Sequence, residues 1–142
     1  MSMDNSSPDA IVLPAQVSRD WLFQLYSNAY FDVELDSDGD ICIRDGFRIW
    51  VFPIREGEQI RFMSQFRANP MHELIDRLQY ANRINDELHF IRCYVDRDGD
   101  IGFDSYLIVS GGVTRRNIVF ATRAFIDHVR AALVKDDTDV IA

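Results

Sequence analysis

The chain has 142 residues, of which 47% are hydrophobic and 27% are charged, which is the composition of one globular domain. Its 23 acidic side chains outnumber 15 Lys and Arg, and the formal charge of −8 argues against nucleic acid or an anionic membrane surface as a partner, because both attract basic proteins. Two cysteines make no disulfide scaffold, the N-terminus lacks the features of a secretory signal, and no stretch approaches the roughly 20 apolar residues of a membrane span. The expected location is therefore a reducing cytoplasm.

The first half of the chain predicts a helix followed by an antiparallel meander. Residues 1–14 are polar with a short apolar end and are expected to form a flexible tail. Ser18 can cap a helix that runs to about Ala29, because its hydroxyl can accept a bond from an unpaired N–H of the first turn. The apolar face of this helix is expected to hold Trp21, Leu22, Leu25 and Ala29. Strands are expected at 31–35, 41–43, 47–53 and 60–66, with a tight turn at Asp38-Gly39.

The second half predicts a helix, a hairpin and a last helix. Asn69-Pro70 predicts the start of a helix that ends near Glu87, because Pro is favoured at the first helical position. The residues expected along one face of this helix are Met71, Leu74, Ile75, Leu78, Ala81 and Asn85. Strands at 89–95 and 101–109 follow, and Thr114 can cap a last helix that runs to about Val134. The acidic residues 135–142 are expected to fray.

The order of these elements indicates an α+β fold, because hairpins occur without strand–helix–strand alternation. We expect one antiparallel sheet of five or six strands with three helices, in a single domain at residues 15–134. An Asp-x-Asp-Gly-Asp-Ile segment occurs twice, beginning at Asp36 and at Asp96. Each copy lies inside a hairpin that follows a helix, so the sequence holds a weak internal repeat.

Four segments together resemble the YbjN family, which has a fold similar to that of type III secretion chaperones. They are Ala81-Asn82-Arg83-Ile84-Asn85, the strand 89–95, the turn Asp96-Arg-Asp-Gly-Asp100, and Gly111-Gly112-Val113-Thr114 at the start of the last helix. The family is described as bacterial sensory transduction regulators with no established enzyme activity. The resemblance implies a small cytoplasmic interaction domain, often dimeric, that carries no catalytic residues and no cofactor.

The two acidic segments are the strongest candidates for a metal site, because calcium loops begin with carboxylates at positions 1, 3 and 5. Such loops continue with Gly at position 6 and a bidentate Glu at position 12. Position 6 is Ile41 or Ile101 here, and position 12 is Phe47 or Leu107. We therefore interpret both segments as hairpin turns and expect no bound metal.

Asn82 and Asn85 stand at the end of the second helix. A functional interpretation makes Asn85 a ligand-binding amide. The favoured interpretation is structural, because amides at the point where a helix leads into a strand can satisfy buried backbone groups.

Gly111, Gly112, Thr114 and Arg115 form a possible anion site, because a helix N-terminus presents unpaired N–H groups and a positive dipole end. No phosphate-binding glycine pattern accompanies them. A flexible turn with a cap is therefore the favoured interpretation of the loop.

The strand 47–53 is apolar on both sides, which is unusual for a sheet with one face in water. Trp50 and Phe52 share one side of it, and Met63 is the comparable residue of the next strand. We expect Trp50, Phe52 and Met63 to form the interface of a homodimer. The alternative is that a helix or residues 11–13 of the same chain cover them.

Three functions are compatible with these observations. The favoured hypothesis is a non-enzymatic regulator or chaperone-like adaptor that binds another protein, whose identity the residues do not give. The second is a sensor of a small ligand or anion that uses the Gly111-Gly112 loop. The third is an enzyme, although the histidines have no paired metal spacing and no serine lies in a Gly-x-Ser-x-Gly motif.

Overall fold

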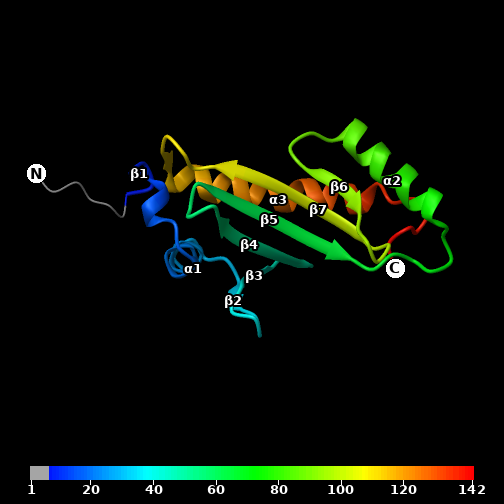
Figure 1. The fold of residues 1–142 in the computed structure, drawn as a ribbon, viewed down its shortest axis with the longest axis horizontal. Coiled ribbons are helices and arrows are strands. Elements are labelled where there is room, and N and C mark those ends of the chain that lie inside the picture. Colours follow the sequence, from blue (N-terminus) through cyan, green and yellow to red (C-terminus); the bar gives the residue numbers. More distant parts are fainter. Residues whose placement is uncertain (1–6) are drawn as a thin grey trace, which may run out of the picture. The chain divides into compact units, whose positions relative to one another are not determined.

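The computed structural model describes residues 7–142. This part of the chain holds three α-helices, α1 (Arg19–Asn28), α2 (Leu74–Glu87) and α3 (Arg115–Val134), none of them long and apolar enough to cross a membrane. A six-stranded antiparallel sheet has the order β2-β3-β4-β5-β7-β6 (Figure 1), and β1 pairs separately with β8. The strands are β1 (Ile11–Val12), β2 (Val33–Leu35), β3 (Ile41–Arg44), β4 (Arg48–Ile54), β5 (Gln59–Phe66), β6 (Arg92–Val95), β7 (Ile101–Ile108) and β8 (Val113–Thr114). The α+β fold class is confirmed.

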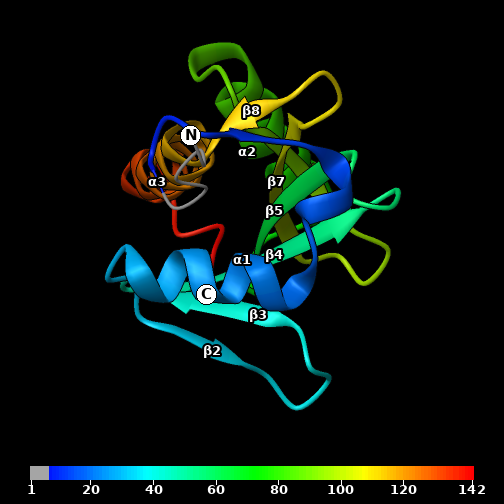
Figure 2. The same cartoon turned by 90° about the vertical axis from the view of Figure 1, so that its left-hand side faces the viewer.

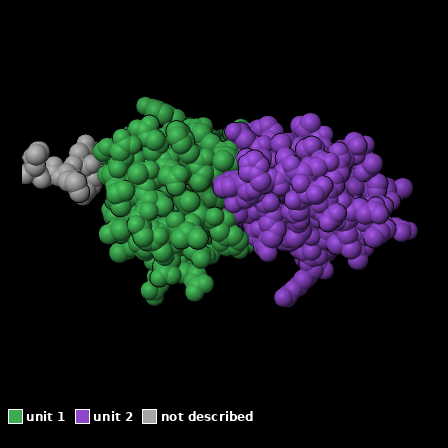
Figure 3. All heavy atoms as spheres, turned by 90° about the horizontal axis from the view of Figure 1, so that it is seen from above, with its two compact units in different colours: residues 1–62, 106–124 green, residues 63–105, 125–142 purple. Residues whose placement is uncertain are grey.

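The chain divides into two compact units, coloured separately in Figure 3. Unit 1 takes the chain up to Phe62 together with Tyr106–Ala124, and unit 2 takes Met63–Ser105 together with Phe125–Ala142. The boundaries therefore fall within β5, β7 and α3. The single domain at 15–134 stays a prediction.

The core of unit 1 forms where α1 meets the first strands of the sheet (Figure 2). Ser18 caps α1 as predicted, since its hydroxyl accepts the N–H of Trp21 at 3.1 Å. Tyr26 is fully buried, and its hydroxyl lies 2.9 Å from that of Thr122. The Thr122 hydroxyl donates its hydrogen bond to the carbonyl of Ile118 at 2.8 Å. Tyr26 is therefore the donor in the bond between the two hydroxyls. Burial raises the pKa of Tyr26, which keeps that proton in place.

The N-terminal segment is more ordered than the flexible tail expected at 1–14. Ile11 and Val12 pair with Thr114 and Val113, and Val12 is only 1% exposed. Residues 14–16 then form a short 3₁₀ helix. Burial of the Val12 side chain and pairing of the backbone with β8 account for this order. Residues 1–6 of the predicted tail lie outside the described part of the chain.

The two acidic segments form hairpin turns of the same geometry. Asp36 accepts the backbone N–H groups of Asp38 and Asp40 through Oδ1, both at 2.9 Å. In the second turn, Asp96 accepts the corresponding groups of Asp98 and Asp100 at the same distance.

A helical arginine holds each of these turns. Arg19 of α1 donates from Nη1 to the carbonyl of Gly39 at 3.1 Å, and Arg77 of α2 donates in the same way to Gly99 at 3.0 Å. Both glycines have positive φ, 80° and 87°, which suits a residue without a side chain. The internal repeat seen in the sequence is therefore also a structural repeat of helix, strand, acidic turn and strand.

Helix α2 begins at Leu74 rather than at the predicted Pro70. Asn69 starts a turn instead of a helix, because its Oδ1 accepts the N–H of Met71 at 3.0 Å while its Nδ2 donates to the carbonyl of Asp139 at 2.8 Å. Asp76 then accepts the N–H of Glu73 at 3.0 Å and caps the helix. Asn69, which the sequence suggests as the helix cap, instead bonds to a segment about 70 residues further along the chain.

The C-terminal residues 135–142 are bonded to the rest of unit 2 rather than frayed. The N–H of Asn69 donates to the carbonyl of Val140 at 2.7 Å, and the N–H of Ala142 donates to Arg67 at 2.9 Å. Val140 is 2% exposed. Asp136 accepts the N–H groups of Val140 and Ile141, so an acidic residue that suggested fraying instead closes a turn.

The strand predicted at 89–95 is shorter in the structure, where β6 begins at Arg92. Phe90 adopts a φ of 77°, which interrupts an extended strand. Its carbonyl accepts a hydrogen bond from the hydroxyl of Ser105 at 2.8 Å, which holds this bend against β7.

Candidate protein-binding surface

Helix α2 exposes a row of large apolar side chains. Met71 is 86% exposed, Leu74 56%, Ile75 54% and Leu78 46%. Leu74, Ile75 and Leu78 share one side of α2 because of their helical spacing, and Met71 lies in the turn before the helix. We call Met71, Leu74, Ile75 and Leu78 the α2 row.

The buried side of α2 is a different stripe from the one predicted. Tyr80 and Ala81 are 6% exposed and Ile84 is 0% exposed. Tyr80 donates its hydroxyl to the carbonyl of Ala132 at 2.7 Å, and burial raises its pKa. Of the residues predicted along one face, only Ala81 is buried. The side chains of the α2 row face water.

Arg77 fixes the rotation of α2. Its guanidinium donates to the carbonyls of Gly99 and His72, both at 3.0 Å, from the same side of the helix as Tyr80 and Ile84. An arginine in the middle of the inward stripe makes that stripe look polar in the sequence. The α2 row flanks this anchored stripe and has a rim of exposed polar residues, Glu73, Gln79 and Asn82.

Asn85 joins α2 to β6 through its amide. Nδ2 donates to the carbonyl of Cys93 at 3.0 Å, and Oδ1 accepts the N–H of the same residue at 2.9 Å. Both polar atoms of the amide are thus used on backbone, as the structural interpretation predicts. Asn82 differs, because its side chain shows no hydrogen bond within residues 7–142, although both residues are exposed.

The three predicted interface residues are half-buried rather than fully exposed. Trp50 and Phe52 alternate with the buried Ile49 and Val51, so they share the outer side of β4. Trp50 donates from Nε1 to Oδ2 of Asp36 at 3.1 Å, which fixes its ring. Met63 belongs to unit 2, while the other two belong to unit 1.

The predicted anion loop uses several of its donors internally. Thr114 accepts the N–H of Asn117 at 3.0 Å, which confirms the cap, and the N–H of Arg116 donates to the carbonyl of Pro8 at 2.9 Å. Gly111 and Gly112 have φ values of 87° and 95° and form the turn before β8. The Arg115 guanidinium lies 5.1 Å from the centre of the Trp21 ring.

Three carboxylates of the first acidic turn, Asp36, Asp38 and Asp40, place oxygens within 4.8 Å of one another. The oxygens of Asp36 already accept bonds from two backbone N–H groups and from Trp50. These bonds lower the pKa of Asp36, chiefly through the backbone N–H of Asp40. The turn therefore uses its first carboxylate for its own structure, and the absence of a metal stays a prediction.

Both cysteines are buried free thiols. Burial raises the pKa of Cys93 to about 12 and raises that of Cys42 as well. Since the thiolate is the reactive form, neither side chain is suited to act as a nucleophile near neutral pH.

Comparison with known proteins gives a family and a fold. Residues 18–133 match the sequence profile of the YbjN family, described as "putative bacterial sensory transduction regulator". The crystal structure of YbjN from E. coli, described as "a putative transcription regulator", is similar with a TM-score of 0.76 and 14% identity, over 93% of this chain and 98% of that one. None of the curated proteins compared with the chain shows significant sequence similarity to it.

Two chaperone structures have the same fold at lower similarity. One is a structure of the HopA1-SchA chaperone-effector complex, with a TM-score of 0.54 and 9% identity over 78% of this chain and 88% of that one. The other is the Yersinia pestis type III secretion chaperone SycH in complex with a stable fragment of YscM2, with a TM-score of 0.51 and 16% identity over 82% and 97%. The expected likeness to type III secretion chaperones is confirmed at the level of the fold.

Proposed function

The chain belongs to the YbjN family, and we propose that it is a regulatory domain that binds another protein through the α2 row. It acts by binding rather than by catalysis. The observation that carries this proposal is the exposure of four large apolar side chains, three of them at helical spacing on α2. The complexes formed by the two chaperones of the same fold support it by analogy.

The physical reason for a partner is the cost of keeping the α2 row in water. Full burial of one Leu, Ile or Met side chain contributes roughly 1.5–3 kcal/mol. Leu74, Ile75 and Leu78 are already about half buried, so covering the row contributes part of the binding free energy, and the other contacts of the partner supply the remainder. The polar rim around the row resembles the periphery of a protein interface. An amphipathic helix of a partner, with its own apolar side chains three and four residues apart, fits such a surface.

A site-specific crosslinking experiment tests this surface. A photoreactive amino acid at Leu78 should crosslink to a protein partner in cells of the source organism, whereas the same group at Val134 should not. Val134 is a matched position, because it is also apolar, helical, in unit 2 and 81% exposed. Leu74→Lys with Leu78→Lys should abolish the crosslink at Ile75, and Val134→Lys should leave it intact. Equal crosslinking from both positions would reject the α2 row as the binding surface.

We also propose, as a separate claim, that the chain forms a homodimer through Trp50, Phe52 and Met63. The partial exposure of all three side chains supports it, because each retains apolar surface to bury. Sedimentation at tens of micromolar should show a dimer for the wild type and a monomer for Trp50→Glu. A dimeric Trp50→Glu protein would exclude this face, and a dimer dissociated by Leu78→Lys would move the interface to the α2 row.

The cytoplasm is the proposed location. Two buried thiols without a disulfide support it, because cytoplasmic proteins keep cysteines reduced. Fractionation of the source cells, with thiol trapping before lysis, would test it.

A further inference from the structure

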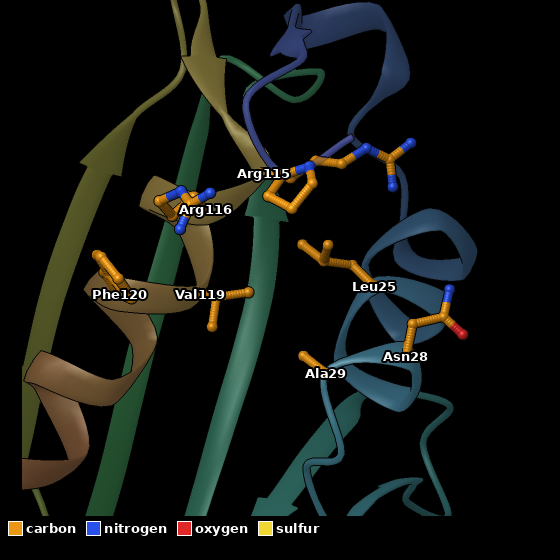
Figure 4. Close-up of a pocket in the computed structure, with 8 residues that line it drawn as sticks. Leu25, Asn28, Ala29, Arg115, Arg116, Val119 and Phe120 are labelled. Carbon is orange, nitrogen blue, oxygen red and sulfur yellow. The ribbon is translucent and has the colours of Figure 1, made fainter. Parts of the chain in front are cut away.

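A groove in unit 1 lies between α1 and the first turns of α3, and it has a volume of about 320 Å³ (Figure 4). Leu25 and Ala29 project from α1 toward α3, and Val119 projects from α3 toward α1. Phe120, which is 59% exposed, adds an aromatic side chain at the edge. The walls are therefore apolar, and the volume is at the lower end of the roughly 300–1,000 Å³ range of small-molecule sites.

One end of this groove is cationic. Arg115 and Arg116 line it, and the remaining lining residues include no carboxylate. Arg115 and Arg116 are the first two residues of α3, a 20-residue helix whose dipole adds positive potential at this end. This charge is local, because the chain as a whole has a net charge of −8.

Arg115 has donor capacity that the chain does not use. Its Nε is buried and has no hydrogen-bond partner within the described residues. The guanidinium instead lies over the ring of Trp21, 5.1 Å from its centre, a contact that fixes its position without consuming N–H donors. Arg116 is different, since its Nε already donates to Asp9 at 3.0 Å. Nε itself is enclosed, so the donors open to a ligand are the Nη groups of Arg115, which make no hydrogen bond within the described residues.

We propose that this groove binds a small carboxylate with an apolar body. The carboxylate accepts charge-assisted hydrogen bonds from Arg115, and the body lies between Leu25, Ala29 and Val119. At roughly 30 Å³ for each water-sized group, the groove takes about ten non-hydrogen atoms. Octanoate has this size, charge and shape. The site differs from the Gly111-Gly112 loop and is independent of the α2 row, which belongs to unit 2.

Trp21 supplies a direct readout, because ligand binding at Arg115 changes the surroundings of its ring. Octanoate, below the concentration at which it forms micelles, should shift the tryptophan fluorescence saturably, and calorimetry should give one site per chain. Octanol, which lacks the negative charge, and inorganic phosphate, which lacks the apolar body, should each bind at least about tenfold more weakly. Equal binding of octanol, or equal binding of phosphate, would overturn the proposal.

Two variants and a control separate the charge from the apolar wall. Arg115→Gln should weaken octanoate binding at least about tenfold, the effect of one charge-assisted hydrogen bond. Val119→Phe keeps the charge but fills the groove, and it should weaken binding as well. Arg55→Gln removes an exposed arginine of the same unit outside the groove and should change nothing. Each protein is first checked for a native far-ultraviolet spectrum, and wild-type affinity in folded Arg115→Gln or Val119→Phe protein would refute the site.

Discussion

Helices α1 and α2 begin the same structural repeat and differ in what covers them. Each is followed by a strand, an Asp-x-Asp-Gly-Asp turn and a returning strand, and each donates an arginine hydrogen bond to the turn. On α1 the apolar stripe is buried, with Leu22 at 0% and Leu25 at 7% exposure. On α2 the stripe with the same spacing is exposed, with Leu74 at 56% and Leu78 at 46%.

The difference teaches that apolar spacing predicts an interface without saying which molecule provides the other side. On α1 the other side is the core of its own unit. On α2 the chain uses a neighbouring stripe that contains Tyr80 and Ile84 and leaves the α2 row for something else. An exposed stripe of this kind is the surface that the proposed partner would cover.

The largest expected effect is on stability, from cutting back buried residues of both helices. Leu22→Ala and Ile84→Ala should each lower the free energy of unfolding by about 2–5 kcal/mol, because each leaves a cavity in a fully buried site. Leu78→Ala should change it by less than about 0.5 kcal/mol, because its side chain is nearly half exposed. Urea denaturation followed by circular dichroism measures all three. If Leu78→Ala costs as much as Ile84→Ala, the α2 row is core and the comparison fails.

The next effect concerns the attachment of α2 to β6. Asn85→Ala should lower the free energy of unfolding by about 1–3 kcal/mol, because it leaves the N–H and the carbonyl of Cys93 without their partner. Asn82→Ala is the matched control, because Asn82 is equally exposed on the same helix, and it should have little effect, since its side chain makes no hydrogen bond within the described residues. Denaturation midpoints decide between them. A neutral Asn85→Ala that loses partner binding would indicate a ligand-contacting amide instead.

Features set by neighbouring residues could be predicted from the sequence. The caps at Ser18 and Thr114, the turn at Asp38-Gly39 and the extent of α3 need only local hydrogen bonds and backbone preferences. The fold class followed from the order of such elements. The structural role of Asn85 stays a prediction, which the two hydrogen bonds from its amide to the backbone of Cys93 support.

Features set by distant contacts could not be predicted. Asn69-Pro70 has the pattern of a helix start, but Asn69 bonds to Asp139 and Val140, some 70 residues away in the chain, and the helix begins later. The rotation of α2 depends on Arg77, which donates one of its hydrogen bonds to Gly99 in the second acidic turn. The donor capacity of Arg115 was equally hidden, because only the folded chain shows that Trp21, rather than an acid, lies beside it.

A smaller effect comes from pH and tests whether α2 stays docked over β6. Burial raises the pKa of Cys93 to about 12, against about 8.5 for an unfolded thiol. Between these values the unfolded chain has lost a proton that the folded chain retains, so Cys93 lowers stability as pH rises. The fall in midpoint from about pH 7 to about pH 10 should therefore be smaller in Cys93→Ala than in wild type. An identical fall in both proteins would mean that Cys93 is solvated and that α2 opens readily.

The smallest expected effect is that of calcium on the acidic turns, where we predict none. In both turns, Oδ1 of the first aspartate accepts hydrogen bonds from two backbone N–H groups. Oδ2 accepts a hydrogen bond from the side chain of Trp50 in the first turn and from that of Gln65 in the second. Position 6 of each segment is a fully buried isoleucine, Ile41 or Ile101, where a calcium loop needs glycine.

Titration with calcium, compared with magnesium at equal ionic strength, should leave the melting temperature unchanged. Asp36→Asn should lower it in either salt, because the neutral amide accepts the same N–H groups more weakly. A saturable calcium shift present in wild type and absent in Asp36→Asn would establish a metal site in the turn of unit 1. The two turns would then differ in metal binding as well as in the exposure of the helices that hold them. Among the described residues, Asp36, Asp38 and Asp40 are the only group of three whose ligand oxygens all lie within 4.8 Å of one another.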